Sequence, residues 1–365
     1  MAYTTIDDPS EYFQTALYTG NGASSRALTN DGNSNLQPDW VWIKDRSAAF
    51  HHILGDSSRG SAKKLASDGN YAENDSSELN TSYGYVDTFN TDGFTTGGGS
   101  TQVNKSSNNY VAWQWKANGG STTTNDASST SVGTIDSVYQ ANTTAGFSIV
   151  TYTGTTSAGT IAHGLGAVPK MIIIKNRDDG AENWAVYHAG IASDAETDYL
   201  YLDTTNAAAD DANLFNDTAP TSTVFSIGTS GVVNQAEAHI AYCFAEKQGY
   251  SKFGSYIGNG NANGAFVYTG FKPALIIIKR TDSADHWQIQ DIKRHGSNGE
   301  NSRLQPNDSS AEATNSTWTS MDFLSNGFKQ RYTDSIMNVS SGTYIYIAFA
   351  EHPFVSSKGV PTTAR

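Results

Sequence analysis

The stretch Pro169–Lys175, PKMIIIK, decides the fold class of this chain. Three of its four consecutive apolar residues are β-branched, which stiffens χ1 and favours the pleated backbone of a strand. A strand that is apolar on both faces lies in the middle of a packed structure, and proline is tolerated only at its first position. The same frame occurs twice more, as PDWVWIK at Pro38–Lys44 and PALIIIK at Pro273–Lys279. We interpret it as the anchor strand of a repeated unit.

Each anchor frame has the same place in a longer repeat. An aromatic strand with a turn glycine precedes it, and a strongly apolar strand ends 71, 69 and 70 residues after the anchor lysine, at Trp115, Phe244 and Phe349. Matched spacing and chemistry at both ends indicate three copies of one domain-sized unit. The copies span residues 1–116, 146–250 and 251–365, the last with a short polar tail.

The two junctions between the copies differ in length and composition. Residues 117–145 are rich in Gly, Ser, Thr and Asn, which is typical of a flexible linker. Copies two and three are joined by KQGYSK alone, so we expect those two to dock tightly.

The composition favours an all-β protein. The chain has 365 residues with 34 Gly, 19 Tyr, 15 Phe and 7 Trp, and only 16% of its residues are charged. Many short strands separated by turn clusters, without a long amphipathic helical pattern, predict three tandem antiparallel β-sandwiches of jelly-roll or lectin-like type.

The charge and the hydropathy pattern exclude two classes of partner. A formal net charge of −13 argues against nucleic acid and anionic membranes, which both need basic surfaces. No stretch approaches the ~20 apolar residues of a membrane span, and the N-terminus does not resemble a signal peptide. We therefore expect no membrane insertion, and release by cell lysis if the protein works outside the cell. The single cysteine, Cys243, lies in the apolar run IAYCFA and is interpreted as a buried, inert thiol.

Catalytic patterns are missing from the sequence. His51 and His52 are adjacent and would point to opposite faces of a strand, which is poor geometry for one metal ion. Asp68, Asp203 and Asn307 correspond between copies, but the third is an amide, so we predict a turn-forming role for them. The sequence therefore predicts a non-enzymatic protein, with no catalytic, cofactor-binding or metal-binding residue and no cofactor.

The paired tryptophans and the anchor lysines of the repeat are of residue types that often bind ligands. Trp40 and Trp42, like Trp113 and Trp115, could stack on sugar rings if they were exposed. The other copies have Met, Ile, Leu, Tyr or Phe at these positions, which predicts a core role. The anchor lysines are interpreted as solvated strand ends.

Several long motifs carry a resemblance to a known family. MAYTTIDDPSEYF, PDWVWIKDR, HGLGAVPKMIIIKNR, TAPTSTVFSIG, IAYCFAEKQGYSKFGSYIGNG and YIYIAFAEHPF resemble uncharacterised repeat domains in virion proteins of marine tailed bacteriophages. The resemblance runs from about Tyr3 to Phe354. It implies a structural virion protein, assembled in the host cytoplasm and released by lysis.

The resemblance leaves several functions open. The leading hypothesis is a tail-associated fibre or appendage component that presents its loops to the host surface or to neighbouring subunits. The alternatives are a capsid decoration or head-fibre protein and a glycan-binding receptor module, with a depolymerase last. The expected partners are other virion proteins of the tail or capsid and a host-surface glycan, and we expect the chain to form a homo-oligomer.

Overall fold

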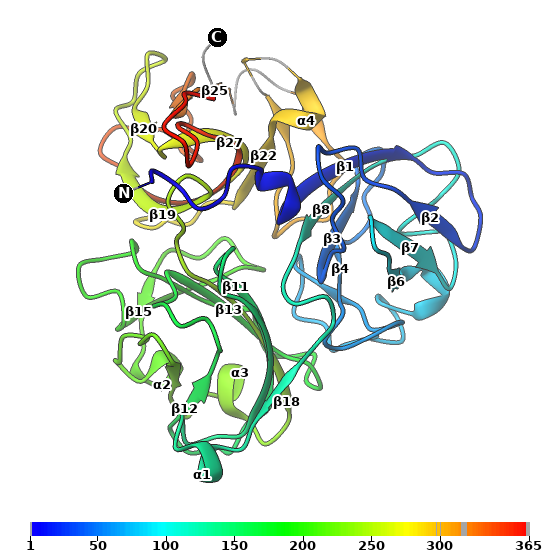
Figure 1. The fold of residues 1–365 in the computed structure, drawn as a ribbon, viewed down its shortest axis with the longest axis vertical. Coiled ribbons are helices and arrows are strands. Elements are labelled where there is room, and N and C mark those ends of the chain that lie inside the picture. The colour runs from blue at the N-terminus through cyan, green and yellow to red at the C-terminus, as the bar shows by residue number, and fades with distance from the viewer. Residues whose placement is uncertain (1, 297, 300, 315–319, 363–365) are drawn as a thin grey trace.

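The computed structural model describes residues 2–296, 298–299, 301–314 and 320–362. The protein is all-β, as predicted, and its sheets are antiparallel. Its strands form three lobes that meet at a common centre (Figure 1). We refer to the lobes as the first unit (Pro9–Trp115), the second unit (Thr123–Phe244) and the third unit (Ser251–Pro353).

One strand order occurs in the main sheet of every unit. The first unit contains β1 (Phe13–Thr19), β8 (Asn109–Trp115), β3 (Trp40–Asp45) and β4 (Ile53–Asp56), in that spatial order. The second contains β11 (Phe147–Thr153), β18 (Ala238–Phe244), β13 (Met171–Asn176) and β14 (Ala185–His188). The third contains β19 (Ser251–Ile257), β27 (Thr343–Pro353), β21 (Phe271–Arg280) and β22 (Gln288–Asp291). The predicted anchor strands are β3, β13 and β21, and each has a strand on both sides.

A smaller sheet accompanies each main sheet. These sheets consist of β2 (Arg26–Leu28), β7 (Phe94–Gly97) and β6 (Tyr85–Phe89); β12 (Gly159–Ala162) and β17 (Val224–Ile227); and β20 (Phe266–Tyr268), β26 (Gly327–Gln330) and β25 (Met321–Leu324). In the first and third units, alternate side chains of the main sheet point toward the smaller sheet and form a core with it.

The remaining elements are short. The strands are β5 (Leu65–Ala66), β9 (Thr123–Asn125), β10 (Ser137–Asn142), β15 (Asp198–Tyr201), β16 (Ala209–Asp210), β23 (Ser302–Arg303) and β24 (Ala313–Thr314). The helices are η1 (Pro9–Glu11), η2 (Thr81–Tyr83), α1 (Ala127–Thr130), α2 (Ala212–Phe215), α3 (Gly231–Asn234) and α4 (Ile292–His295).

The segment 117–145 differs from the expected flexible linker. It contains β9, α1 and β10, and β10 pairs along the whole edge of β11, from Ser137 opposite Tyr152 to Asn142 opposite Phe147. The boundary expected at residue 146 therefore falls in the turn of a hairpin. Composition was misleading here because the strand-forming residues Val138 and Tyr139 of β10 stand among many Gly, Ser, Thr and Asn residues.

All three units share one hydrophobic core. The Trp40 ring lies 4.3 Å from the ring of Tyr242 in the second unit, centroid to centroid. Phe349 of the third unit lies 5.6 Å from Trp115 and 5.9 Å from Phe244. The prediction that the paired tryptophans are core residues is confirmed, since none of the four is more than 1% exposed.

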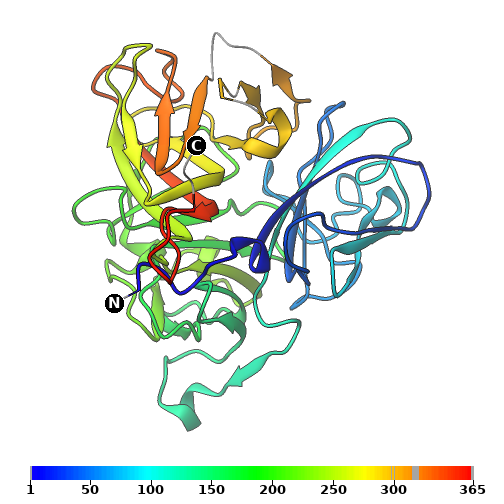
Figure 2. The same cartoon turned by 45° about the horizontal axis from the view of Figure 1, so that its top comes forward.

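The chain ends also join two units. The N-terminal segment runs along the third unit before it enters β1 (Figures 1 and 2). The Tyr3 hydroxyl donates to the Gly270 carbonyl at 2.6 Å, and Asp7 accepts from the backbone and the hydroxyl of Ser357. The first unit is therefore fixed to the third as well as to the second.

Candidate functional site

The anchor lysines are buried, and the expectation that they are solvated strand ends is wrong. Lys44, Lys175 and Lys279 each have an exposed fraction of 0%. Burial lowers the pKa of each lysine to about 8, although nearby carboxylates act in the opposite direction. The physical reason is that carbonyl groups replace water around each ammonium group. For Lys44 and Lys175 the loop after the anchor strand provides such carbonyls, whereas Lys279 donates to the carbonyls of Arg280 and Thr205.

Two of these lysines connect neighbouring units. The Lys44 ammonium donates to the carbonyl oxygen of Ser309 in the third unit at 2.9 Å. The Lys279 ammonium donates to the carbonyl oxygen of Thr205 in the second unit at 3.2 Å. Lys175 uses carbonyls of its own unit, those of Asp179 and Glu182. The repeated lysine therefore has a structural role, because its ammonium group binds backbone carbonyls within a unit or between units.

A backbone hydrogen bond joins each pair of units at equivalent positions. The acceptor is the carbonyl two residues after the anchor lysine, and the donor is a backbone N–H of the neighbouring unit. The backbone N–H of Glu73 donates to the carbonyl oxygen of Arg177 at 2.7 Å. The N–H of Ala208 donates to the carbonyl of Thr281 at 2.9 Å, and the N–H of Glu312 donates to the carbonyl of Arg46 at 2.9 Å. First joins second, second joins third, and third joins first, so the units form a closed ring.

A buried ionic network reinforces the junction of the first and second units. Arg59, whose side chain is fully buried, lies 2.5 Å from Asp56 and 3.0 Å from Glu73. Glu73 also accepts two hydrogen bonds from Arg177 of the second unit, at 3.0 and 2.9 Å. Burial would raise the pKa of Glu73, but hydrogen bonds and charge from Arg177 and Arg59 lower it to about 2. The carboxylate is therefore ionised.

The junction of the third and first units repeats this network. Arg294 lies 2.5 Å from Asp291 and 3.5 Å from Glu312, and Glu312 accepts two hydrogen bonds from Arg46 of the first unit. In the same junction the Trp113 indole donates to Asp291 at 3.0 Å. Sequence reasoning missed both networks. The signal was the repeated D-x-x-R pattern, DSSR and DIKR, whose Asp is the last residue of the fourth strand of the sheet.

The three corresponding acid and amide positions cap strands. Asp68, Asp203 and Asn307 each accept the backbone N–H of the residue that precedes the fourth strand: His52 at 2.9 Å, Trp184 at 3.1 Å and Trp287 at 3.0 Å. Each of these residues lies in a turn. Its side-chain oxygen binds a backbone N–H that is 16, 19 or 20 positions earlier in the chain, a contact that the predicted turn-forming role does not include.

The two adjacent histidines have separate partners. The His51 ring contacts Asp68 at 2.8 Å and Glu78 at 3.2 Å, whereas the buried His52 ring accepts from the Trp42 indole at 2.9 Å. Cys243 is fully buried, as predicted, and burial raises the pKa of its thiol. Within the described ranges, no three His, Cys, Asp or Glu side chains are grouped so that they could hold a metal ion.

Among the described residues, three equivalent inter-unit grooves are further candidates for a functional site. At the third–first and second–third junctions, the first strand of one main sheet lines a cavity together with the segment that follows the fourth strand of the neighbouring unit. At the first–second junction, β10, which is paired with β11, contacts the equivalent segment. We name them the first–second groove (β11 and residues 57–59), the third–first groove (β1 and residues 292–294) and the second–third groove (β19 and residues 189–191).

The chain itself fills the first–second groove. β10 lies along β11 and directs Gln140 across the groove. The Gln140 amide nitrogen donates to the hydroxyls of Ser57 and Ser58 at 2.8 and 2.6 Å. Since β10 pairs with β11 and β9 pairs with β10, β11 is not the edge strand of its sheet.

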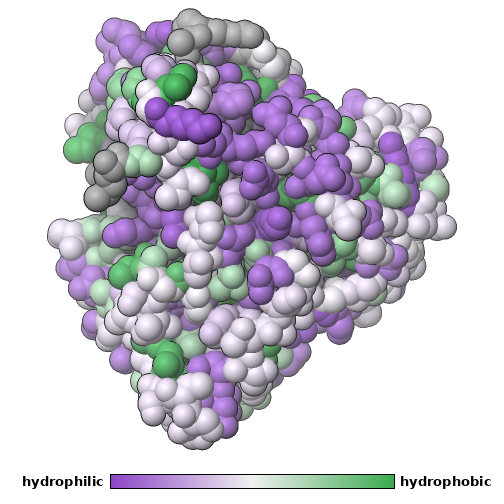
Figure 3. Space-filling view, viewed as in Figure 1, coloured by the Kyte–Doolittle hydropathy of each residue, from purple (hydrophilic) through white to green (hydrophobic). Residues whose placement is uncertain are grey.

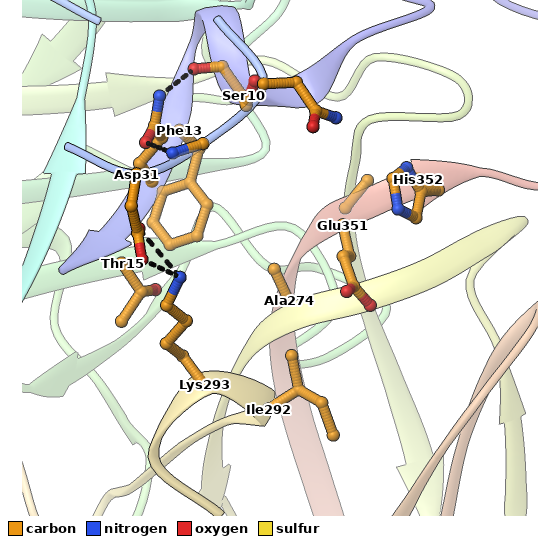
Figure 4. Close-up of a pocket in the computed structure, with 13 residues that line it drawn as sticks. Ser10, Phe13, Thr15, Asp31, Ala274, Ile292, Lys293, Glu351 and His352 are labelled. Carbon is orange, nitrogen blue, oxygen red and sulfur yellow. Dashed lines mark hydrogen bonds and ion pairs between the residues drawn. The ribbon is translucent and has the colours of Figure 1, made fainter. Parts of the chain in front are cut away.

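An ion pair crosses the third–first groove. Lys293 lies 2.8 Å from both carboxylate oxygens of Asp31, on the loop that follows β2 (Figure 4). The same loop is bound to β1, because Gln14 accepts from the Gly32 N–H at 3.0 Å and donates to the Ser34 carbonyl at 2.7 Å. A cavity of about 220 Å³ remains beside β1. Its charges are largely paired within the protein, as Glu351 on its far wall pairs with Lys272 at 2.6 Å.

The second–third groove is open and uncharged. It has a volume of about 580 Å³ and is lined by small or apolar residues of the second unit, residues 189–193, and by Ser255, Ile257, Thr281 and Thr343 of the third. The Ile257 side chain is 65% exposed. In the described part of the chain, no other segment pairs with the outer edge of β19 in this groove.

The fold is that of an all-β protein. Its repeated polar residues, namely the anchor lysines, the capping Asp or Asn and the Asp–Arg–Glu networks, bind strands and neighbouring units to one another. The chain belongs to the family described as domain of unknown function DUF7483, whose model matches residues 8–353. No curated protein and no solved structure matched the chain. Among the described residues, no helix is long and apolar enough to cross a membrane.

Proposed function

We propose that this chain is a non-enzymatic structural protein of a tailed-phage virion, most simply a fibre or appendage component of the tail. The observation that carries the proposal is the use of the repeated polar residues. The anchor lysines, the capping Asp or Asn and the Asp–Arg–Glu networks all serve to hold strands or join units.

The closed ring of units supports a mechanical role. Each unit contacts both others, through a shared aromatic core and through buried polar bonds. Separation of any one unit would expose part of that apolar core to water and would leave buried charges without partners. Both changes raise the free energy of the chain. A rigid body of this kind holds its surface loops at fixed positions for contact with neighbouring subunits or a host.

The surface also suits such a role. The face in Figure 3 is mainly hydrophilic or neutral, with apolar side chains scattered over it. The large apolar side chains exposed in the described residues are Leu17, Tyr83, Val168, Ile257, Phe266, Tyr268 and Val360. Together with the net charge of −13, this favours solubility at high local concentration.

The test is to locate the protein in purified particles. Antibodies raised against the recombinant chain, used with gold labels on gradient-purified virions, should mark the tail. Label on the capsid shell would instead establish the decoration alternative. Absence of the chain from purified virions, measured by mass spectrometry against the major capsid protein as the internal standard, would overturn the virion proposal.

A further inference from the structure

The three inter-unit grooves are equivalent by position, but the described residues occupy only two of them. In the first–second groove, β10 adds a strand to the edge of β11. In the third–first groove, the loop that carries Asp31 folds along β1 and pairs with Lys293. The second–third groove has neither a strand nor an ion pair among the described residues. This difference points to an external occupant.

The edge of β19 offers free backbone groups to such an occupant. β27 pairs with one side of β19, and Gly254 and Tyr256 point their backbone groups toward it by antiparallel alternation. The backbone groups of Ser255 and Ile257 point to the other side. None of the hydrogen bonds found in the described chain engages them. An edge strand whose outward N–H and C=O groups have no hydrogen-bond partner can pair with an added strand from another chain.

β10 shows which side chains an added strand would direct across the groove. Gln140 of β10 binds Ser57 and Ser58. At the equivalent positions, the first and second residues after the fourth strand, the second unit has Ala189 and Gly190. These residues offer no side-chain hydrogen bond, so an amide in the place of Gln140 would be left unsatisfied. The groove therefore suits a small apolar side chain.

We propose that the second–third groove binds an extended segment of a partner protein, which adds antiparallel to β19 through Ser255 and Ile257. The segment carries small, uncharged side chains toward Ala189, Gly190 and Ile191. This inference does not depend on the proposal that the chain is a virion protein. It rests only on the unpaired edge of β19 and on the uncharged lining of the second–third groove.

The first experiment uses a synthetic peptide as the probe. The peptide copies residues 136–143, DSVYQANT, with Ala in place of Gln140, and carries a fluorescent label. Fluorescence anisotropy with the full chain should show saturable binding. Ser255→Pro should weaken it about tenfold or more, because proline removes an outward N–H and its ring obstructs the ladder.

Controls separate strand addition from other causes. Ser255→Ala keeps the backbone N–H and should bind as the wild type does. Ala192→Arg changes an exposed residue of the groove wall without touching β19, and should also weaken binding. Circular dichroism checks that each variant is folded, since proline is tolerated at an unpaired edge position.

Hydrogen exchange gives a second, independent readout. The amides of Ser255 and Ile257 should exchange quickly in the free chain and become protected when the peptide is bound. Equal binding by Ser255→Pro, or no saturable binding by the wild type, would overturn the proposal. Protection of these amides without peptide, together with a dimer in sedimentation, would also overturn it and assign the edge to a second copy of this chain.

Discussion

Replacement of Glu73 by glutamine should weaken the junction of the first and second units. The Glu73 side chain is 7% exposed and accepts charge-assisted bonds from Arg59 and Arg177. The change keeps the volume of the side chain and removes its charge. It therefore tests the electrostatic contribution of the network without opening a cavity.

The expected loss can be bounded from the contacts. Removal of one partner from a buried ion pair costs about 3–5 kcal/mol. Arg59 keeps its contact with Asp56 at 2.5 Å, and the Arg177 side chain is 18% exposed and can be partly hydrated. We therefore expect the low end of that range, about 3 kcal/mol in the free energy of unfolding.

The assay is urea denaturation of the full chain, followed by tryptophan fluorescence, since the shared core contains four tryptophans of the first unit. Lys63→Met is the matched control. Lys63 also pairs with Glu73, at 3.2 Å, but its side chain is 44% exposed, so its loss should cost less than about 1 kcal/mol. A loss below about 1 kcal/mol for Glu73→Gln would refute the reasoning that the network holds the units together.

The lowered pKa of Glu73 predicts that the free energy of unfolding depends on pH. The pKa of Glu73 is lowered from 4.5 to about 2 in the folded chain, so its contribution to stability is complete above pH 4.5. Between pH 4.5 and about 2 the unfolded chain binds a proton that the folded chain does not, so this contribution is lost as the pH falls. Glu73→Gln should show a shallower loss of stability over that range than the wild type. Parallel curves would contradict the assignment.

The remaining predictions concern the repeated scaffold. Lys175→Met should lower the free energy of unfolding by about 1–3 kcal/mol in thermal denaturation, because the carbonyls of Asp179 and Glu182 lose their donor; an unchanged stability would contradict this. Trp40→Ala should cost about 3–5 kcal/mol and raise hydrogen exchange in all three units, since the ring is central to the shared core; exchange confined to the first unit would contradict this. Gly154→Ala should destabilise the second unit and reduce soluble expression, because a Cβ would lie 2.0 Å from the Gln235 carbonyl oxygen; wild-type expression and melting temperature would contradict this.

Much of the fold could be predicted from the sequence. β-Branched and aromatic residues in short runs specify strands locally, and comparison of copies identified Trp40 and Trp113 as core residues because Leu or Ile stands in their place elsewhere. A turn-forming role was predicted for Asp68, but its hydrogen bond to the N–H of His52, 16 residues earlier, was not. The segment 117–145 was misread because its many Gly, Ser, Thr and Asn residues hide the short strand β10, which is identified by its pairing with β11.

The sequence by itself determined the strands, the repeat and the residues that would be buried in any sheet, because these follow from local propensity and alternation. Only the tertiary structure decided how the units close into a ring. A carbonyl of the third unit completes the set of acceptors around the buried Lys44, and Arg177 of the second unit adds to Arg59 in keeping Glu73 ionised. The state of a charged side chain depends on which distant groups replace its water, and that information is not contained in the residues around it.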